Sequence, residues 1–497
     1  MSAAGKASLS AAGEASSSGP ARPAAVTRAH AEDPSAGGSP WSAGTAEAYL
    51  LGLERFGMHF GLEKMGRLMA LLGSPHEGFA SIHVVGTNGK SSTTRMIAAI
   101  LERHGVRTGS YTSPHLVSFT ERIQVGERDL SDERFGRAVE RVARAAAVVD
   151  QLRPAGGADE GRDPVTQFEA LTGAAYAELD GAGVEVAVIE AGLGGRYDAT
   201  SVIESKVAVL TNIGLEHTAW LGDTIAEIAA EKLAVVPAGG VLVLGGCLHP
   251  DALAVARGVA DERGARIVEA AVALAPEISL RARGSYQRRN FAVAIAAAEA
   301  YLASPLDPEA VRRAAGELLV AGRFEVLERQ TPPTGGGPPP ADRTTRIGDG
   351  RSGAVTLLDG AHNPAGIEAL VESLAEFLAG RRLCAVVSVL EDKDARSMLA
   401  ALLPVCDRVI CTAASNPRAL PADILGETAG EVASTTVGGA GVGWNATAGA
   451  VEVEVEADPG RAVALGRLRE PDGVVLVTGS IYLISDVVRG PRRGSTL

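Results

Sequence analysis

Short apolar runs that end in glycine alternate along this chain with longer stretches in which apolar residues recur every three or four positions. The run SIHVVG (81–86) leads into SSTTRMIAAILERHG (91–105), which has the spacing of a helix that closes on a glycine. The runs VEVAVIEAG, KVAVLTNIG and GGVLVLGG follow, and each leads into a loop or a helix. Strands that alternate with helices are typical of doubly wound folds. We therefore predict an α/β protein with a mostly parallel sheet.

The alternation is interrupted once by a segment that is too rich in proline and glycine for the interior of an element. This segment begins with TPPTGGGPPPADR, and we interpret 331–350 as a surface insertion. Strand and helix patterns resume after it and continue to GVVLVTGSIYLISDVV. The sequence thus predicts a first domain over 43–322 and a smaller C-terminal α/β domain over 323–490. Residues 1–42 contain few large apolar residues, so we expect a disordered tail there.

Composition and charge exclude several classes of protein. The chain has 497 residues, 46% of them hydrophobic, which is enough for two or three domains with large cores. Its formal net charge of −13 is opposite in sign to that expected of a nucleic-acid binder. No long uncharged apolar run predicts a membrane span, and the four cysteines fit no metal-ligand spacing. We therefore expect a cytoplasmic protein with neither a nucleic-acid nor a membrane partner.

The strongest local signal is GTNGKSS, from Gly86 to Ser92, between a predicted strand and a predicted helix. Gly86 and Gly89 let the backbone turn tightly and point N–H groups at phosphate oxygens. Lys90 and the N-terminus of the helix add positive charge at the same place. The spacing is shorter than the full GxxxxGK[ST] pattern, and an ordinary strand-to-helix turn is the alternative. The adjacent lysine and serines favour phosphate binding.

Three polar residues follow predicted strands in the same way: Ser113 in TSPHL, Glu190 in VIEAG and His217 in GLEHT. Ligands of open α/β sheets bind outside the carboxyl ends of the strands. All three side chains are therefore expected near the loop Gly86–Ser92, which we call the phosphate loop. A hydroxyl, a carboxylate and an imidazole can hold Mg²⁺ beside nucleotide phosphates. Taken singly, each is better explained as a helix cap, a solvated acid or a locally packed imidazole. Only the shared position favours a metal site.

Several motifs then occur in a fixed order between residues 44 and 489: GTNGKSS, TSPHL, EAGLGGRYDAT, NIGLEHTAWLG, AAEK, QRRN, GRFEV and DGAHNP. Together they resemble the folylpolyglutamate synthase/dihydrofolate synthase family of the Mur ligase superfamily. The phosphate loop is common to all Mur ligases, whereas TSPHL, GLGGRYDAT and DGAHNP are specific to the folate branch. The resemblance implies a P-loop ATPase domain and a smaller C-terminal Rossmann-like domain, with ATP in the cleft between them.

The resemblance also implies roles for individual residues. ATP would be bound by Gly86, Thr87, Asn88, Gly89, Lys90, Ser91, Asn290, Arg323, Asp359 and His362. Two Mg²⁺ ions would be held by Ser113, Glu190, His217 and a carbamylated Lys232. The pterin would be lined by Val165, Thr166, Gln167, Phe168, Tyr197, Asp198 and Ala199. Lys90, Glu190, His217 and Lys232 would be the catalytic residues.

Two of these assignments depart from what the pattern or the family predicts. Taken alone, Lys232 in the helical stretch TIAEIAAEKLAVV is best explained as an exposed helix lysine, and an ammonium has no lone pair for a metal. Carbamylation would convert this ammonium into a carboxylate and remove the objection. Ser91 stands where the family usually has glycine, which restores a Lys–Ser pair as in other Mur ligases.

The implied activity is an ATP-dependent amide ligase that joins L-glutamate to dihydropteroate, to folylpolyglutamate or to both through an acyl phosphate. The family further implies a monomer that takes only small-molecule substrates. One alternative is a Mur-type peptidoglycan amino acid ligase, which would need an additional nucleotide-sugar domain of about 100 residues at the N-terminus. Another is a P-loop switch that hydrolyses nucleotide without ligation and has no need of the DGAHNP loop.

Overall fold

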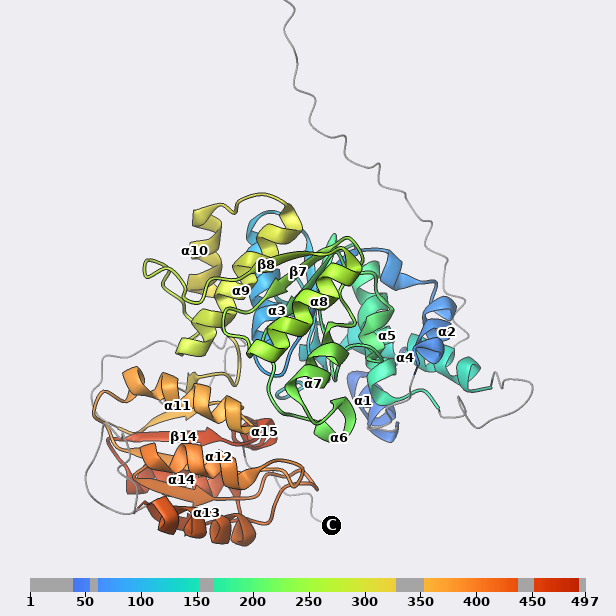
Figure 1. The fold of residues 1–497 in the computed structure, drawn as a ribbon. Coiled ribbons are helices and arrows are strands. Elements are labelled where there is room, and N and C mark those ends of the chain that lie inside the picture. Colours follow the sequence, from blue (N-terminus) through green and yellow to red (C-terminus); the bar gives the residue numbers. More distant parts are fainter. Residues whose placement is uncertain (1–38, 54–60, 152–163, 328–352, 437–450, 491–497) are drawn as a thin grey trace, which may run out of the picture. The chain divides into compact units, whose positions relative to one another are not determined.

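The computed structural model describes residues 39–53, 61–151, 164–327, 353–436 and 451–490. The expected tail over 1–42 lies almost wholly outside these residues, and the expected insertion over 331–350 lies wholly outside them. The described residues from Pro40 onward group into one compact unit, which contains two β-sheets (Figure 1).

The first sheet has eight strands in the order β4-β3-β2-β5-β1-β6-β7-β8. Its parallel strands are β1 (Ala80–Val85), β2 (Thr108–Tyr111), β5 (Val186–Glu190), β6 (Val207–Leu210), β7 (Val241–Leu244) and β8 (Arg266–Glu269). The short strands β3 (Ile123–Val125) and β4 (Arg128–Asp129) run antiparallel at one edge. The predicted mostly parallel sheet is thus confirmed. Because β1 pairs with β5 on one side and β6 on the other, the direction of winding reverses at β1, where such sheets open a crevice for ligands.

Helices cover both faces of this sheet because successive side chains of each buried strand point to opposite sides. Val207 and Val209 of β6 join one core cluster, whereas Ala208 and Leu210 join another. The first cluster is covered by α3 (Lys90–Arg103), α9 (Ser285–Leu302) and α10 (Pro308–Glu317). On the other face lie α1 (Ala43–Gly52), α2 (Glu63–Leu71), α4 (Asp132–Gln151), α5 (Gln167–Gly181), α7 (Ile225–Leu233) and α8 (Pro250–Arg263).

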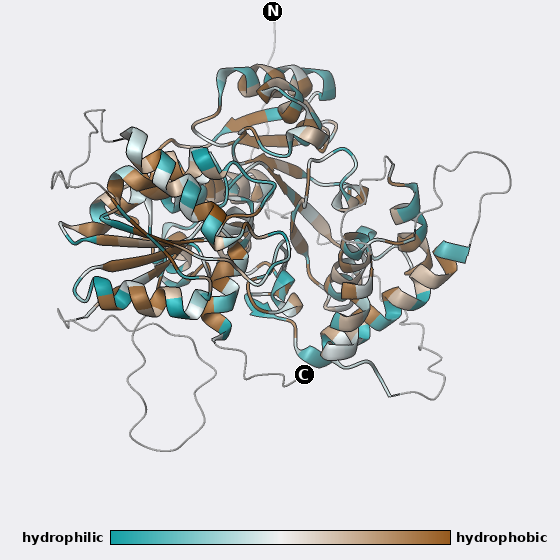
Figure 2. Cartoon of the chain, turned by 90° about the horizontal axis from the view of Figure 1, so that it is seen from below, coloured by the Kyte–Doolittle hydropathy of each residue, from teal (hydrophilic) through white to brown (hydrophobic). Residues whose placement is uncertain are grey.

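The second sheet has six strands in the order β13-β12-β11-β14-β10-β9. They are β9 (Glu325–Leu327), which is antiparallel, β10 (Val355–Leu358), β11 (Leu383–Val387), β12 (Arg408–Cys411), β13 (Glu452–Val455) and β14 (Val474–Thr478). One face packs on α11 (Pro364–Leu378), α12 (Ala395–Leu402) and α13 (Ala422–Thr436), and the other on α14 (Pro459–Arg469) and α15 (Ile481–Arg489). Figure 2 shows the hydrophobic strands enclosed by helices whose outward positions are hydrophilic. The second α/β layer structure agrees with the predicted fold class.

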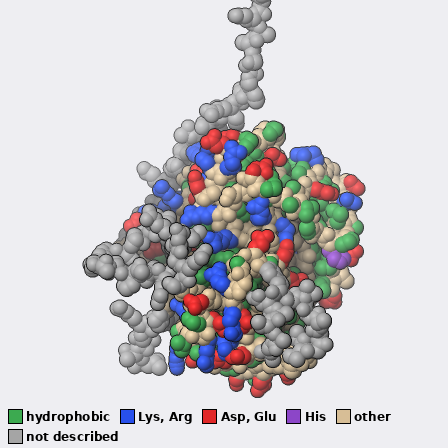
Figure 3. Space-filling model, turned by 90° about the vertical axis from the view of Figure 1, so that its left-hand side faces the viewer, with side chains coloured by type: hydrophobic (Ala, Val, Ile, Leu, Met, Phe, Trp, Pro, Cys, Tyr) green, Lys and Arg blue, Asp and Glu red, His purple; other side chains and the backbone are tan. Residues whose placement is uncertain are grey.

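The remaining elements are short. They are α6 (Thr218–Leu221) and the 3₁₀ turns η1 (Pro75–Glu77), η2 (Phe119–Arg122), η3 (Ala199–Val202) and η4 (Leu403–Val405). No helix among the residues that the structure describes is both long enough and apolar enough to cross a membrane. On the face shown in Figure 3, Lys and Arg side chains lie among Asp and Glu side chains, so this face carries no single sign of charge.

Acid is expected to weaken this fold through a buried histidine in the central strand. His83 lies on β1 with its Nε2 atom 2.9 Å from Thr200 Oγ1, and burial lowers its pKa to about 4. The unfolded chain takes up this proton near pH 6.5, so the contribution is present above pH 6.5 and is lost as the pH falls toward 4. Between pH 7 and 5 we expect His83 to remove about 2 kcal/mol from the free energy of unfolding. Urea titrations of His83→Gln should show a correspondingly weaker pH dependence, and identical profiles would contradict the assignment.

Candidate active site

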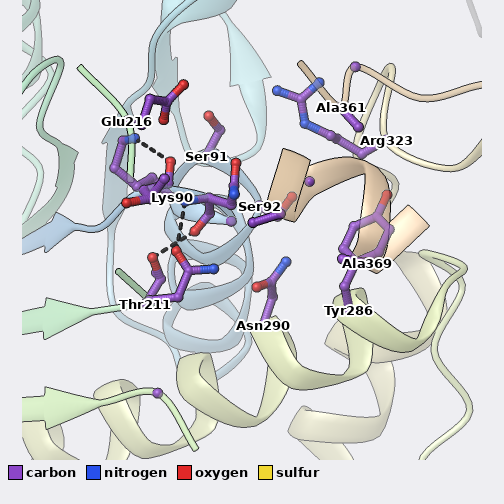
Figure 4. A pocket seen from close by; sticks show the side chains of 18 of the residues that line it. Lys90, Ser91, Ser92, Thr211, Glu216, Tyr286, Asn290, Arg323, Ala361 and Ala369 are labelled. Atoms are coloured by element: carbon purple, nitrogen blue, oxygen red, sulfur yellow. Dashed lines mark hydrogen bonds between the residues drawn. The ribbon is translucent and has the colours of Figure 1, made fainter. Parts of the chain in front are cut away.

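A cavity of about 600 Å³ lies at the carboxyl ends of the central strands of the first sheet and is closed by residues of the second (Figure 4). Its walls come from the loops that follow β1, β2, β5, β6 and β7, from α9, and from the loop that follows β10. The sequence-predicted residues that line it are Thr87, Asn88, Gly89, Lys90, Ser91, Ser113, Glu190, His217, Lys232, Asn290, Arg323, Asp359 and His362. Residues from eight separate segments of the sequence therefore share one cavity.

The phosphate loop is fixed by the neighbouring loop that follows β6. The backbone N–H of Thr87 donates to the Asn212 carbonyl at 3.0 Å, and that of Asn88 donates to Asn212 Oδ1 at 2.8 Å. Thr211 Oγ1 donates to the Asn88 carbonyl at 2.7 Å. At Gly89, φ is +80°, and an added Cβ would lie 2.5 Å from Asn290 Oδ1. Glycine is therefore required here both for the left-handed backbone and for the close approach of α9.

Lys90 begins α3, and its side chain folds back over the loop. Its Nζ atom donates to the carbonyls of Gly86 and Thr87, each at 3.1 Å. The ammonium, the free N–H groups of the first helical turn and the positive end of the helix dipole thus face the same cavity. This arrangement suits an anion such as a nucleotide phosphate.

Glu190, at the end of β5, connects the phosphate loop to the loop that follows β2. Its Oε1 accepts a hydrogen bond from Ser91 Oγ at 2.9 Å, and its Oε2 accepts one from the backbone N–H of Ser113 at 3.0 Å. The residue is 1% exposed. Burial raises the pKa of Glu190, whereas the charge of Lys90 and the two hydrogen bonds lower it. A cation bound beside this carboxylate would favour its charged form.

His217, which directly precedes α6, and Lys232 of α7 line the cavity, and burial shifts the pKa of both. Burial, with the charge of Lys393 next in size, lowers the pKa of His217 to about 4, so the imidazole is neutral at pH 7 and able to bind a metal. Burial also lowers the pKa of Lys232 to about 7, with the charge of Lys90 next in size. Lys232 is 4% exposed, so the interpretation of it as an exposed helix lysine is wrong.

The donors around Glu190 suit a divalent cation, although the described residues contain no group of three or more His, Cys, Asp and Glu side chains placed to hold one. The expected set contains only one carboxylate and one imidazole, and adds a serine hydroxyl and a modified lysine. These are a hard oxygen donor set with one nitrogen, which fits magnesium or manganese.

The second sheet contributes a loop whose carboxylate is fully engaged. Asp359 Oδ2 accepts hydrogen bonds from the Tyr286 hydroxyl and from the backbone N–H of Phe324, and Oδ1 accepts one from Ala361 N–H at 2.9 Å. Burial raises the pKa of Asp359, against these hydrogen bonds and the nearby charge of Arg323. The carboxylate thereby ties the strand connection at Phe324, where φ is +51°, to the loop that follows β10.

A pair of amide side chains joins this loop to the phosphate loop. Asn88 Nδ2 donates to Asn363 Oδ1 at 3.1 Å, and Asn363 Nδ2 donates to Asn88 Oδ1 at 3.0 Å. Asn363 also caps α11 by accepting from Gly366 N–H at 2.8 Å. Loops from the two sheets thus meet at the phosphate loop.

The residues expected to face the pterin lie beside the cavity, not in its wall. Thr166 and Glu169 form a capping box at the start of α5, and Gln167 Nε2 donates to the Leu50 carbonyl at 2.8 Å. Phe168 packs on Gly192, where an added Cβ would lie 2.5 Å from the ring, and Gly192 itself lines the cavity. Val165 and Ala199 are buried, and Tyr197 is 39% exposed.

Asp198 is occupied by its own loop. Its Oδ2 accepts from Leu193 N–H at 2.7 Å, and its Oδ1 accepts from Thr200 N–H at 3.0 Å and from the Thr200 hydroxyl. Whatever else it contacts, this carboxylate shapes the turn that follows β5.

Four charged residues at the site were not found from the sequence. Glu216 lines the cavity next to His217, and Lys393 Nζ lies 3.0 Å from Glu216 Oε1. Arg289 and Glu372, which also line the cavity, form a bidentate ion pair with both N–O distances 2.9 Å. Glu216 follows β6 just as His217 does, so the positional reasoning applied to His217 could have included it.

The fold and this site define a ligase of the Mur type. The family model for the Mur ligase glutamate ligase domain matches residues 342–481. A dihydrofolate synthase/folylpolyglutamate synthase of Mycobacterium tuberculosis is 36% identical over 401 residues, which cover 74% of this chain and 77% of that protein. The chain belongs to the folylpolyglutamate synthase/dihydrofolate synthase family and is an ATP-dependent ligase.

Two solved structures show what such proteins bind. Escherichia coli FolC in complex with DHPP and ADP superposes with a TM-score of 0.71 at 25% identity, covering 91% of this chain and 97% of that one. A bifunctional folylpolyglutamate synthase/dihydrofolate synthase with Mn, AMPPNP and L-glutamate bound gives a TM-score of 0.70 at 27% identity, covering 91% and 98%.

Proposed function

We propose that this chain joins L-glutamate to the carboxylate of dihydropteroate, of a folylpolyglutamate or of both, with ATP as the energy source. One observation carries the proposal: the phosphate loop and the buried Glu190 share a cavity that Asp359, Arg323 and His362 close. These three residues belong to the part of the chain from Arg323 onward, which contains the second sheet and which we call the second half. The sequence similarity to the M. tuberculosis enzyme supports the choice of substrates.

The reaction needs an activated carboxylate because oxide is a poor leaving group. A carboxylate oxygen of the folate-side substrate attacks the γ-phosphorus of ATP, the bond to the bridging oxygen breaks, and ADP leaves. The amine of L-glutamate then attacks the acyl carbon of the resulting acyl phosphate, phosphate departs with the bonding electrons, and the nitrogen loses a proton to give the amide. No side-chain nucleophile is required, so the work of the protein is positioning and electrostatic stabilisation.

The phosphate loop carries most of that electrostatic work. Gly86, Thr87, Asn88, Gly89, Lys90 and Ser91 would hold the phosphates through those N–H groups that are not donated to Asn212, through the Ser91 hydroxyl and through the Lys90 ammonium. Asn290, Arg323, Asp359 and His362 would complete the nucleotide site from α9 and the second half. Closure of the second half would exclude water and protect the acyl phosphate from hydrolysis.

We propose that two Mg²⁺ ions bind at Ser113, Glu190, His217 and a carbamylated Lys232. When bound, the ions offset the negative charge of phosphates and carboxylate. Glu190 holds the Ser91 hydroxyl and the Ser113 loop in place for them, and the low pKa of His217 keeps its imidazole unprotonated.

We propose that the pterin lies along Val165–Phe168 and Tyr197–Ala199. The contact of Phe168 with Gly192 supports this placement, since it brings the start of α5 to the edge of the cavity. The chain would act as a monomer in the cytoplasm on these small molecules.

Turnover of the purified chain tests the function. We expect ADP release that requires both L-glutamate and either dihydropteroate or tetrahydrofolate in the presence of Mg-ATP, with the amide product identified by mass. The ratio of the two folate-side rates separates a single-activity from a bifunctional enzyme. Release of ADP without either substrate would instead indicate a nucleotide switch, and turnover of a UDP-linked peptidoglycan precursor would indicate the Mur-type alternative.

A further inference from the structure

Three nitrogen-bearing side chains, each from a different loop, lie within 4 Å of the carboxylate of Glu216. Its Oε1 atom lies 3.0 Å from Lys393 Nζ, 3.5 Å from His362 Nε2 and 3.9 Å from His217 Nε2. Glu216 and His217 follow β6 of the first sheet, whereas His362 and Lys393 follow β10 and β11 of the second. One carboxylate thus connects both halves at the wall of the cavity.

The ion pair is shielded from solvent on both sides. The side chains of Glu216 and Lys393 are 10% and 11% exposed. Burial alone would raise the pKa of Glu216, but the hydrogen bond and charge of His362, followed by the charge of Lys393, hold it well below its usual range. Removing one partner of such a pair leaves a charge that is poorly solvated and unpaired.

Lys393 reaches Glu216 from outside the set of residues that line the cavity. Its own loop is held by backbone hydrogen bonds from Lys393 N–H to the Leu390 carbonyl at 3.0 Å and from Glu391 N–H to the Arg418 carbonyl at 2.9 Å. Glu216 lies on the cavity side, and in Figure 4 its side chain is on the same wall as Lys90. Lys393 therefore acts on the site through Glu216.

We propose that Lys393 and Glu216 form a positioning pair that fixes the second half against the phosphate loop in the geometry needed for phosphoryl transfer. This one ion pair positions both the loop that carries His217 and the loop that carries His362. The proposal rests on the ligase function proposed above and adds Lys393 and Glu216 to its residues. Misplacement of reacting groups by about 1 Å can slow a reaction about 100-fold, so loss of the pair should lower kcat.

The test is a double-mutant cycle on the purified full chain, with Glu216→Gln, Lys393→Met and the double variant. We expect each single variant to lower kcat about 30-fold with KM for ATP changed less than about threefold, since the phosphate loop is untouched. The kcat of the double variant should lie within about twofold of the kcat of each single variant, because the second substitution removes an interaction that is already lost. Lys393→Arg, which keeps the charge, should recover most of the rate.

Arg396→Met is the matched control. Arg396 lies three residues from Lys393 and pairs with Glu431, but both side chains are exposed, at 58% and 64%. Exposed pairs contribute little, so this variant should turn over like the wild type. Equal damage from Arg396→Met and Lys393→Met would overturn the proposal.

Three further results would also overturn it. They are rate losses that multiply in the double variant, a rise in KM for one substrate in Lys393→Met without the same change in Glu216→Gln, and a shifted Mg²⁺ dependence in Glu216→Gln alone. The second would make Lys393 a substrate contact, and the third would make Glu216 a metal ligand. The same cycle on urea unfolding midpoints should also be non-additive. This measurement needs no activity, so it separates failure of the pair from failure of the ligase function.

Discussion

Glu190→Gln is expected to lower kcat for amide formation about 1,000-fold or more. Glu190 is the only Asp or Glu among the expected metal ligands, and the substitution removes its negative charge. The substitution preserves the local geometry. The amide oxygen can accept from Ser113 N–H, and the amide NH₂ can donate to Ser91 Oγ, which is able to reverse its role. The folded structure should therefore survive, and the loss should be one of charge alone.

The measurement is product formation at saturating Mg-ATP, together with the thermal unfolding midpoint and the affinity for ADP. Unfolding and ADP affinity should stay close to those of the wild type, since the phosphate loop is intact. Glu178→Gln is a matched control, because Glu178 is also a shielded carboxylate whose pKa burial raises, but it pairs with Arg134 on α4 and α5. Near-normal amide synthesis by Glu190→Gln would refute the metal-binding role.

The convergence of Ser113, Glu190 and His217 on one cavity could be predicted because it follows from topology. In a parallel sheet the carboxyl ends of neighbouring strands share one edge, and the position of each residue after its strand is visible in the sequence. The hydrogen bonds from Ser91 and Ser113 to Glu190 could not be predicted, because they depend on strand register and on side-chain rotamers.

Contacts between the two halves of the chain could not be predicted from the sequence for a different reason. Asn88 and Asn363 are 275 residues apart, and Lys393 and Glu216 are 177 apart. No local pattern links such pairs, since their approach depends on how the loops of two different sheets pack against each other. The burial of Lys232 was also missed, because an exposed lysine is the commoner case on a helix, whereas Lys232 lies among the buried residues of α7.

The residues expected around the pterin show where motif reading meets its limit. Asp198 lies in a motif specific to the folate branch and Thr166 in the stretch that the resemblance assigns to the pterin, yet the structure uses both side chains as caps, on η3 and α5. A cap and a ligand contact can require the same short polar residue, so the motif alone does not distinguish them. The roles of these residues in binding a pterin remain predictions.

Lys232→Ala is expected to lower kcat about 100-fold and to regain part of the loss when a short carboxylate such as acetate or formate is added. A buried amine whose pKa is about 7 is substantially neutral at pH 7, and only the neutral form reacts with CO₂. In that reaction the nitrogen bonds to the carbon of CO₂ and one proton is released, which leaves a carbamate in place of a cation. The removed side chain leaves room in which a small acid can replace the carbamate oxygens.

Lys232→Met is the matched control for this rescue, because the unbranched methionine side chain fills the space that is left empty in Lys232→Ala. It should be inactive with or without acetate. In the wild type, depletion of CO₂ should lower the rate, and the CO₂ concentration needed for half-maximal activity should rise as the pH falls below about 7, where the amine becomes protonated. Full activity of Lys232→Ala without any additive, or an equal response of the alanine and methionine variants to acetate, would show that Lys232 is only a packing residue.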